Sequence, residues 1–297
     1  MKMGLYPGCS LEGSAREYAE SLRAIAPLLN LDLREVEGWN CCGASSAHII
    51  DHAVSLALPA RILAQAVKQE MDEVLVPCAA CFNRLASAKH ELAADPGVRE
   101  EVSAMIGMNL DDNTEIRNIL EVLDKVLTPD IIKSIPNTFP HKVACYYGCL
   151  LVRPPDVVRS DKPEDPVVMD GLMKKIGATT IDWGMKTECC GASLSIPRTD
   201  IVGILCGRIL EDAFIRGAEA IVVACPMCHS NLDMRRSEVE RTTGKKFSLP
   251  VIYITQAIGL AFGLSPDVLG IQRHFVRMGL EARNKVPQKP LAKEAGS

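Results

Sequence analysis

The sequence predicts an α/β protein made of two similar halves, each with a parallel sheet. Three observations lead to this fold class. The chain has 297 residues, which is enough for two domains with buried cores. Its cysteines fall into two matching sets. Short β-branched runs also alternate with amphipathic helical stretches in each half, a pattern typical of parallel βα units.

The repeat is carried by five cysteines in each half. The first set is Cys9, Cys41, Cys42, Cys78 and Cys81, and the second is Cys149, Cys189, Cys190, Cys225 and Cys228. Corresponding positions are offset by 140, 148 and 147 residues, and flanking segments match, as in NCCGAS and ECCGAS. We therefore expect two pseudo-equivalent domains at residues 1–135 and 136–282. Residues 283–297, rich in Lys, Pro and Ala, are expected to form a flexible tail.

The first half predicts three strands, each followed by a helix or by a cysteine motif. The strands are expected at residues 3–6, 31–36 and 73–76, and the helices at 11–29, 48–70 and 81–93. Residues 96–140 are helical in pattern and charged, and we expect them to link the two halves.

The second half repeats this order. Its strands are expected at residues 142–146, 179–182 and 220–223, and its helices at 168–176, at 200–216 and from Cys225 onward. Both halves are thus expected to be Rossmann-like. In both, the cysteines follow strand ends and open helices, where open α/β sheets hold ligands, and we expect any cluster to lie there near the domain interface.

Composition excludes several classes of function. The formal charge is −4, the pI is about 5.9, and acids and bases are interspersed, so the electrostatic footprint of a nucleic-acid-binding protein is missing. No apolar run reaches the roughly 18 to 20 residues of a membrane span, and residues 251–264 are interpreted as a buried helix. The N-terminus lacks the pattern of a secretory signal. We expect a cytoplasmic protein whose attachment to a membrane would require a partner.

The 12 cysteines are more numerous than an ordinary cytosolic enzyme needs, which favours a role as ligands. A Cys-x-x-Cys pair alone fits either a metal centre or a redox dithiol. The vicinal pair is more informative, because adjacent side chains of an extended segment diverge and fit one zinc ion poorly. Five thiolates per half exceed the four that a structural zinc site or a cubane cluster requires. Iron–sulfur ligation is favoured, while structural zinc and packed or redox-active cysteines stay open.

Several segments resemble the CCG-type cysteine motif found in the B-type subunits of heterodisulfide reductases and in their relatives. They are GLYPGCSLEGSAREY, GWNCCGASSAH, PCAACFNRL, YYGCLLVRPP, KTECCGAS and ACPMCHSNLDMR. The resemblance runs almost from end to end. It implies two noncubane [4Fe-4S] clusters that face each other across the domain interface, each ligated by one of the two cysteine sets. It further implies that the heterodisulfide of coenzyme M and coenzyme B is cleaved between them, with one sulfur and one electron handled at each cluster.

The resemblance also implies partners, since the chain carries no nucleotide-binding signature of its own. These are a C-type subunit with cubane [4Fe-4S] clusters and an A-type flavin subunit, with a possible link to hydrogenase or formate dehydrogenase. Two other functions stay open: a related subunit that acts on another disulfide, thiol or sulfur compound, and an electron-transfer module that binds no substrate.

Other residues near the motifs are weaker candidates. Cys206 is interpreted as a core residue, and Cys145 as packing or support for the ligands. Three histidines are considered as donors to cluster sulfur but are more typical of solvated or structural positions: His48, His52 and His229. Four bases lie close enough in sequence to bind an anionic substrate, although surface solvation or a helix-end charge is the simpler explanation of each: Arg84, Arg153, Lys186 and Arg198. Gly43 and Gly191 are expected to adopt positive φ or to let the backbone approach a cluster.

Overall fold

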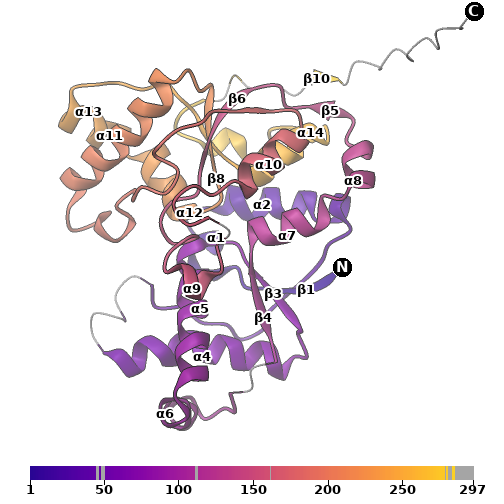
Figure 1. The fold of residues 1–297 in the computed structure, drawn as a ribbon, viewed down its shortest axis with the longest axis vertical. Coiled ribbons are helices and arrows are strands. Elements are labelled where there is room, and N and C mark those ends of the chain that lie inside the picture. The colour runs from indigo at the N-terminus through magenta and orange to yellow at the C-terminus, as the bar shows by residue number, and fades with distance from the viewer. Residues whose placement is uncertain are drawn as a thin grey trace, which may run out of the picture.

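The computed structural model describes residues 1–44, 47, 51–110, 113–160, 162–277, 279 and 283–284. Within these residues the chain forms two four-stranded sheets and a short two-stranded ladder. Both four-stranded sheets are parallel throughout and are flanked by helices. Figure 1 shows most of the N-terminal half, in indigo to magenta, below the C-terminal half, in orange to yellow. The predicted α/β class with two similar parallel sheets is confirmed.

The N-terminal sheet has the strand order β2-β1-β3-β4. Its strands are β1 (Lys2–Leu5), β2 (Asp32–Glu35), β3 (Glu73–Val76) and β4 (Glu115–Asn118). Leu5 of β1 lies opposite Glu35 on one side and Leu75 on the other. The apolar positions of β3 are buried, as expected for an inner strand that helices cover on both faces.

The C-terminal sheet has the equivalent order β7-β6-β8-β9. Its strands are β6 (Lys142–Tyr146), β7 (Thr179–Thr180), β8 (Ala220–Val223) and β9 (Val251–Tyr253). All four residues of the inner strand β8 are buried. The first, second, third and fourth strands along the chain therefore occupy the same places in both sheets, which is the structural form of the sequence repeat.

The helices of the N-terminal half begin and end at recognisable signals. They are α1 (Gly8–Glu12), α2 (Arg16–Ile25), η1 (Pro27–Leu29), α4 (His52–Lys68), α5 (Ala79–Ala94), α6 (Pro96–Ile106), α7 (Ile119–Val126) and α8 (Pro129–Ser134). The Asp51 side chain accepts a hydrogen bond from the backbone N–H of Val54 and caps α4. Asn118 and Glu121 form a reciprocal capping box at the start of α7.

The C-terminal half has a more broken series of helices. They are α9 (Pro155–Val158), α10 (Val168–Lys175), η2 (Ala192–Leu194), α11 (Thr199–Ile215), α12 (Pro226–His229), the π-helical turn η3 (Ser230–Met234), α13 (Arg236–Thr243), α14 (Ile254–Ala261) and η4 (Ile271–Arg273). Where α5 runs without interruption after Cys78, the equivalent segment after Cys225 is divided into α12, η3 and α13. Among the described residues, no helix is long and apolar enough to cross a membrane.

Three predicted elements differ from the structure in kind, and several others differ at their ends, such as the strand predicted at 179–182, of which only Thr179–Thr180 is formed. The helix expected over 11–29 is divided into α1, α2 and η1, because the chain turns at Gly13–Ala15, where Ala15 leaves helical geometry. The region 96–140 contains the sheet strand β4 in addition to helices, since Ile116 and Asn118 alternate as buried positions between charged neighbours. The run 251–264 begins with strand β9 before α14, because its first three residues pair with β8.

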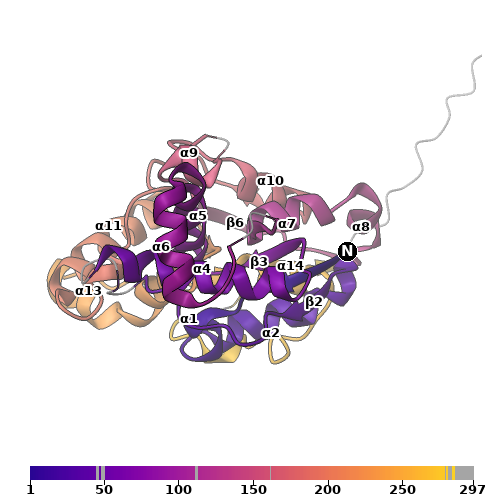
Figure 2. The same cartoon turned by 90° about the horizontal axis from the view of Figure 1, so that it is seen from below.

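The two halves pack through two equivalent helix pairs. Helix α2 of the N-terminal half contacts α14 of the C-terminal half, and α7 contacts α10. Both α2 and α10 follow the first strand of a sheet, and both α7 and α14 follow the fourth, so the interface has pseudo-two-fold character. Figure 1 shows α2 beside α14, and Figure 2 shows the layers from below. One hydrophobic core extends through both sheets and this interface.

The C-terminal segment adds one short contact. The strand β10 (Arg283–Asn284) pairs antiparallel with β5 (Asn137–Thr138), which directly precedes β6 in the sequence. The rest of the predicted tail lies outside the described residues, and the division at residues 135 and 282 stays a prediction.

Candidate metal centre

The ten motif cysteines lie at the carboxyl ends of the strands of the two sheets. β1 leads into α1, which contains Cys9, and Cys78 directly precedes α5 as its N-terminal cap residue. In the C-terminal half, Cys149 follows β6 and Cys225 is the cap residue of α12. Because the carboxyl ends of parallel strands meet at one edge of a sheet, cysteines far apart in the sequence are brought together there.

In the N-terminal half, the vicinal pair faces the Cys-x-x-Cys helix. The Sγ atoms of Cys42 and Cys81 are 3.2 Å apart, and both residues are buried. The backbone N–H of Gly43 donates to Sγ of Cys41 at 3.4 Å, while the Cys41 side chain is exposed. This half therefore has a buried wall of thiols and an exposed edge, where Cys9 also lies.

The C-terminal half repeats this arrangement. The Sγ atoms of Cys190 and Cys228 are 3.6 Å apart and buried, and the N–H of Gly191 donates to Sγ of Cys189 at 3.3 Å. Gly43 and Gly191 have φ of 76° and 78°, so the positive φ expected of both is confirmed. The two thiol sets are thus formed by the same backbone geometry.

The two sets meet at the interface between the halves. Cys78 and Cys225 lie close enough for each thiol to shift the pKa of the other, and the second cysteine of each Cys-x-x-Cys motif also acts on the first. The hydroxyl of Tyr18 contacts the carbonyl oxygens of Pro77 at 3.4 Å and Ala224 at 3.2 Å. These are the residues immediately before Cys78 and Cys225, so one buried tyrosine of α2 connects both cysteine loops.

Glycines give the sulfur atoms room. Gly8 and Gly148, which precede Cys9 and Cys149, have φ of 64° and 69°. A Cβ at Gly8 would lie 3.1 Å from Sγ of Cys81, and one at Gly148 would lie 2.9 Å from Sγ of Cys228. Any side chain here would therefore press on the buried sulfur and also require a strained backbone.

Two tyrosines hold the vicinal pairs in equivalent positions. The Tyr6 hydroxyl donates to the carbonyl oxygen of Asn40 at 2.8 Å, and the Tyr146 hydroxyl donates to that of Glu188 at 2.5 Å. Both carbonyls belong to the residue before the vicinal cysteines. Burial raises the pKa of each tyrosine, which keeps both hydroxyls protonated as donors.

The thiols share protons unequally. Hydrogen bonds with Cys41 and Cys81 lower the pKa of Cys42 to about 3, with the charge of Arg84 acting in the same direction. A hydrogen bond with Cys149 lowers the pKa of Cys189 to about 6, and the charge of Glu188 opposes this shift. Hydrogen bonds with Cys228 and Cys78 also lower the pKa of Cys225. In each half these contacts thus favour ionisation of one thiol over that of its neighbours, and thiolate is the form of cysteine that binds metal.

The donor set fits a thiolate-ligated metal cluster. Soft thiolate sulfur selects zinc, copper(I) and iron–sulfur clusters over hard ions. The glycine cradles and backbone N–H donors to sulfur are features that such clusters use. Among the described residues, no three His, Cys, Asp or Glu side chains are arranged to hold a single metal ion, so the fit lies in the donor chemistry of the thiols and their surroundings.

The two remaining cysteines lie behind the motifs. Cys206 of α11 is fully buried, and its Sγ contacts the carbonyl oxygen of Cys190 at 3.5 Å. The sequence indicates a core position for Cys206 but not this contact, because a loop and the first turns of α11 separate it from the vicinal pair. Cys145 is buried within β6, where its carbonyl accepts from Nε1 of Trp183 at 3.1 Å.

The three candidate histidines lie in different environments. His48 lies outside the described residues. His52 is exposed and pairs with Glu91 at 2.6 Å. His229 is buried directly after Cys228, where Nε2 contacts the carbonyl oxygen of Val251 and the ring stacks on Tyr253 with centroids 4.3 Å apart. Burial lowers the pKa of His229, so its ring is neutral and is part of the interface core.

Three of the four candidate bases have acidic partners. Arg153 pairs with Glu164 at 2.8 Å, Lys186 with Asp165 at 2.8 Å, and the exposed Arg198 with Asp200 at 2.8 Å. Arg84 differs. Its Nη2 donates to the carbonyl oxygen of Ser55 at 2.8 Å, whereas its Nε is buried without a hydrogen-bond partner.

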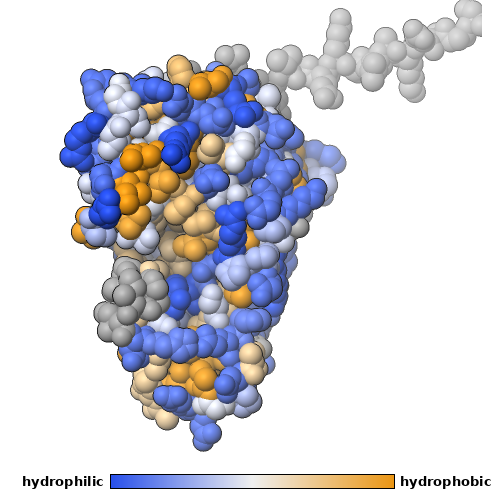
Figure 3. All heavy atoms as spheres, turned by 60° about the vertical axis from the view of Figure 1, so that its left-hand side comes forward, coloured by the Kyte–Doolittle hydropathy of each residue, from blue (hydrophilic) through white to orange (hydrophobic). Residues whose placement is uncertain are grey.

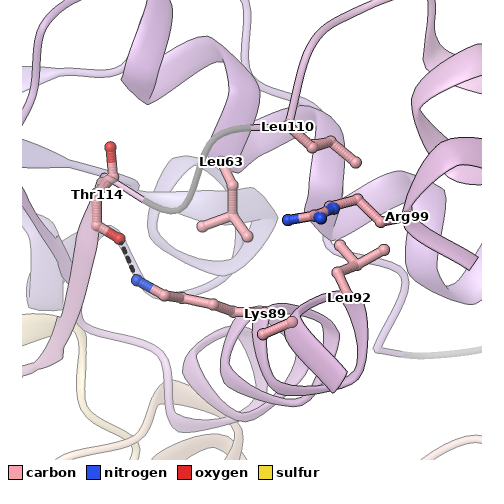
Figure 4. Close-up of a pocket in the computed structure, with 7 residues that line it drawn as sticks. Leu63, Lys89, Leu92, Arg99, Leu110 and Thr114 are labelled. Atoms are coloured by element: carbon pink, nitrogen blue, oxygen red, sulfur yellow. Dashed lines mark hydrogen bonds between the residues drawn. The ribbon is translucent and has the colours of Figure 1, made fainter. Parts of the chain in front are cut away.

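One pocket lies away from the thiols, between α4, α5 and α6. It has a volume of about 190 Å³ and an apolar floor that includes Leu63, Leu92 and Leu110. Figure 4 shows Arg99 reaching into this pocket and Lys89 donating to the carbonyl oxygen of Thr114, at 2.7 Å. Its lining contains no motif cysteine, and we assign the chemistry to the thiols instead.

Apolar side chains also gather on the surface of the C-terminal half. Figure 3 shows this face, which carries α11 and α13. Exposed apolar residues in this part of the chain include Ile196, at 90% exposure, Ile204 and Met234. Ile196 lies just after the Cys189–Gly191 turn, so an apolar surface adjoins one of the thiol sets.

The fold and the two thiol sets define a duplicated, cysteine-rich α/β protein. The model of the CCG cysteine-rich domain family matches residues 3–86 and 143–233, one match in each half. The chain belongs to this family.

Three relatives illustrate its range. The B subunit of a ferredoxin/F420H2-dependent CoB-CoM heterodisulfide reductase from Methanosarcina acetivorans is 33% identical, covering 93% of this chain and 94% of the relative. An 8-methylmenaquinol:fumarate reductase membrane anchor subunit from Wolinella succinogenes is 30% identical, covering 93% and 97%. A protein from Archaeoglobus profundus, described as similar to the B subunit of heterodisulfide reductase, is 29% identical, covering 91% and 94%.

A solved structure shares the fold. A hypothetical protein from Helicobacter pylori superposes with a TM-score of 0.76 over 93% of this chain, at 13% identity. The chain spans about half, 52%, of that protein's length. At this identity the likeness concerns the fold alone.

Proposed function

We propose that this chain is the iron–sulfur subunit of a heterodisulfide reductase complex that reduces the disulfide of coenzyme M and coenzyme B to the two thiols. The observation that carries the proposal is the meeting of two equivalent five-cysteine sets at one interface, where Cys78 contacts Cys225. Heterodisulfide reductase B subunits match nearly the whole chain at 32–33% identity. A substrate with two sulfur atoms suits a site with two halves.

The proposed ligands are the ten motif cysteines, with one noncubane [4Fe-4S] cluster per half. The N-terminal ligands are Cys9, Cys41, Cys42, Cys78 and Cys81, and the C-terminal ligands are Cys149, Cys189, Cys190, Cys225 and Cys228. A bound cluster supplies one-electron transfer and a soft site for a substrate sulfur. The chain itself contributes thiolates, backbone N–H donors from Gly43 and Gly191, and a buried wall that keeps water from the inner sulfurs.

The exposed edge of each set is where substrate would enter. Cys41 and Cys189 are exposed, whereas Cys42 and Cys190 are buried behind them. A disulfide approaching the exposed edge of either set would reach thiols of that set without passing through the core. In this proposal residues 1–135 and 136–282 act as two cluster domains, and residues 283–297 as a tail outside them.

The complex would supply the electrons. We propose a C-type subunit with cubane [4Fe-4S] clusters and an A-type flavin subunit as partners, with hydrogenase or formate dehydrogenase further upstream. The exposed apolar surface that includes Ile196 adjoins the C-terminal thiol set and suits subunit contact. A cytoplasmic location completes the proposal, because thiolate ligands are best preserved in a reducing compartment.

One relative favours a second candidate function. The Wolinella succinogenes protein is named as part of a quinol:fumarate reductase and is 30% identical over almost its full length. The chain would then transfer electrons within a complex, or act on a different sulfur compound, while keeping the same cysteine ligands.

Anaerobic purification followed by iron and sulfide analysis tests the shared part of both candidates. About eight irons per chain are expected for two four-iron clusters. EPR of the oxidised protein then separates the candidates. A paramagnetic signal that appears on adding coenzyme M or coenzyme B thiol supports the reductase. Iron without a thiol response supports electron transfer or another substrate, and zinc in place of iron contradicts the proposal.

A further inference from the structure

The two thiol sets have the same ligands but different charges around them. The motifs align residue by residue, so Arg84 in CFNRL corresponds to Asn231 in CHSNL, and Asn40 in NCCG corresponds to Glu188 in ECCG. Both differences have the same sign. Arg84 gives the N-terminal set one positive charge that the C-terminal set lacks, and Glu188 gives the C-terminal set one negative charge that the N-terminal set lacks.

Arg84 lies near enough to the N-terminal thiols for its charge to act on Cys42. It follows Cys81 by three residues in α5, so both side chains leave the same helix face. Its Nη2 is fixed on the carbonyl oxygen of Ser55, which orients the guanidinium, and its buried Nε has no hydrogen-bond partner. No acidic side chain of the described residues lies within ion-pair distance of it. A buried N–H that lacks an acceptor indicates a position for an absent acceptor, and cluster sulfur is one.

Asn231 plays a neutral role at the equivalent place. Its Nδ2 donates to the carbonyl oxygen of Cys190 at 2.9 Å, and its Oδ1 accepts from Ser195 at 2.8 Å. Both ends of the amide are therefore used within the protein. The C-terminal set thus has a fixed backbone support where the N-terminal set has a cation.

Glu188 adds a negative charge beside the C-terminal set. It directly precedes Cys189, and its charge acts on that thiol. Asn40 is uncharged, and its side chain is occupied by the carbonyls of Cys41 and Leu58 and by Arg61. Arg61 has a sequence counterpart in the exposed Arg208.

Other charges near the sets are balanced. Arg153 and Lys186 pair with acids, Arg235 lies 3.5 Å from Glu238, and Glu12 lies 3.6 Å from Arg23. Arg236 is the exception: it is buried and its Nη atoms donate to the carbonyl oxygens of Phe247 and Leu249, but its counterpart in the N-terminal half is Lys89, so this cation does not distinguish the halves. Exposure acts in the same direction as the unbalanced charges, since Cys9 is exposed whereas its counterpart Cys149 is only partly so.

Reduction adds one negative charge to an iron–sulfur cluster. A nearby cation, a hydrogen bond to sulfur and contact with water all stabilise the reduced form, whereas a nearby carboxylate destabilises it. Arg84 supplies the cation and an unused Nε donor that could serve as the hydrogen bond, and Glu188 supplies the carboxylate. The charges therefore separate the reduction potentials of two otherwise equivalent clusters.

We propose that the N-terminal cluster has the higher reduction potential and is reduced first, with Arg84 and the Glu188/Asn40 difference as the residues that set this order. The proposal rests on the proposed function. A one-electron donor such as dithionite loses one electron, which the N-terminal cluster gains. A second electron then reduces the C-terminal cluster. Arg84 thus distinguishes the two sites by placing a positive charge near the N-terminal cluster only.

An EPR-monitored redox titration with dithionite and mediators tests this order. R84Q removes the charge and the Nε donor. R84Q is compared with the wild type at the potential that half-reduces the first cluster of the wild type. There the ratio of reduced to oxidised first cluster is expected to be about tenfold lower in R84Q, which corresponds to a decrease of about 59 mV in the reduction potential of a one-electron couple. R84K retains the charge and should recover part of this shift. E188N is expected to raise the potential of the second cluster and leave the first unchanged.

R99Q is the matched control, because Arg99 carries the same charge in the same half but lies on α6 in the pocket of Figure 4. Its titration should match that of the wild type. The proposal is overturned if R84Q shifts the second cluster, or neither, while iron content is unchanged. If the wild type binds no iron, the proposed function fails instead, and the two failures are therefore distinguishable.

Discussion

The N-terminal and C-terminal halves place five cysteines on the same framework but support them differently. Strand order, the glycines at 43 and 191, and the tyrosines at 6 and 146 are matched. The residues behind the thiols are not matched. Asn231 and Cys206 contact the Cys190 carbonyl in one half, whereas Arg84 bonds to Ser55 in the other. The backbone thus determines where sulfur lies, and the surrounding side chains make the two sites unequal.

Removing one buried cysteine from each half gives the largest test of this equivalence. C42S and C190S are each expected to lose about half of the iron, roughly four atoms per chain, if each half holds its own cluster. Iron and sulfide analysis measures this loss. C145A is the control, since Cys145 lies within β6, and its iron content should not change. Complete loss in either single variant would show that the halves do not load independently.

The Tyr18 contact tests whether the halves depend on each other. Tyr18 is fully buried, stacks on Tyr253 with centroids 4.2 Å apart, and reaches both cysteine loops. Y18A is expected to lower the free energy of unfolding of the metal-free protein by about 3–5 kcal/mol, through lost packing. Y18F removes only the hydroxyl and should cost about 1 kcal/mol. Urea denaturation followed by circular dichroism measures both losses of unfolding free energy. If Y18F cost as much as Y18A, the hydroxyl and not the packing of the ring would account for the stabilisation by Tyr18.

The glycine cradles offer a matched pair. G8A and G148A each introduce a Cβ at positive φ, near Sγ of Cys81 and Cys228 respectively. We expect a cost of about 1–3 kcal/mol in unfolding free energy from the strained backbone. G148A should be the worse of the two, because its sulfur contact is closer. Urea denaturation compares them, with G107A as a control at positive φ where nothing lies within 4 Å of the Cβ.

The interface core of the C-terminal half predicts sensitivity to acid. Burial lowers the pKa of His274 from 6.5 to about 4. Because the unfolded chain binds this proton more readily, the contribution of His274 to stability is complete above pH 6.5 and is lost as pH falls toward 4. The loss at pH 5 is expected to be about 1–2 kcal/mol. H274Q should reduce the difference in unfolding free energy between about pH 7.5 and about pH 5, and an unchanged difference would exclude His274 as its source.

The N-terminal half has no histidine at the position equivalent to His229. Phe82 occupies the position equivalent to His229, the ring on which His274 packs with centroids 4.6 Å apart. Raised pKa values at Glu17 and Asp233, caused mainly by burial, act in the opposite direction, because they stabilise the fold at low pH. The comparison of H274Q with the wild type removes these shared contributions.

Much of the fold could be predicted because the relevant signals are local. The strands at 73–76, 142–146 and 220–223 have the predicted bounds, since inner strands of parallel sheets are short, continuous apolar runs. The sequence does not indicate strand β4, because only two of its residues are buried and the residues that alternate with them are charged. The alternation of apolar and polar residues that is typical of a strand is therefore weak here. The division of the helix at 11–29 depends on the turn at Gly13, which hydrophobic periodicity does not indicate.

The sequence by itself determined the repeat, the two parallel sheets and the residues that form each thiol set, because cysteine spacing and strand patterns recur at offsets of 140 to 148 residues. Only the tertiary structure decided how the sets meet. The Cys78–Cys225 contact and the Tyr18 bridge join positions 147 and 206 residues apart, beyond any local period. The buried Nε of Arg84 was likewise invisible in the sequence. Burial and missing partners depend on which surfaces pack together, and packing is a property of the whole chain.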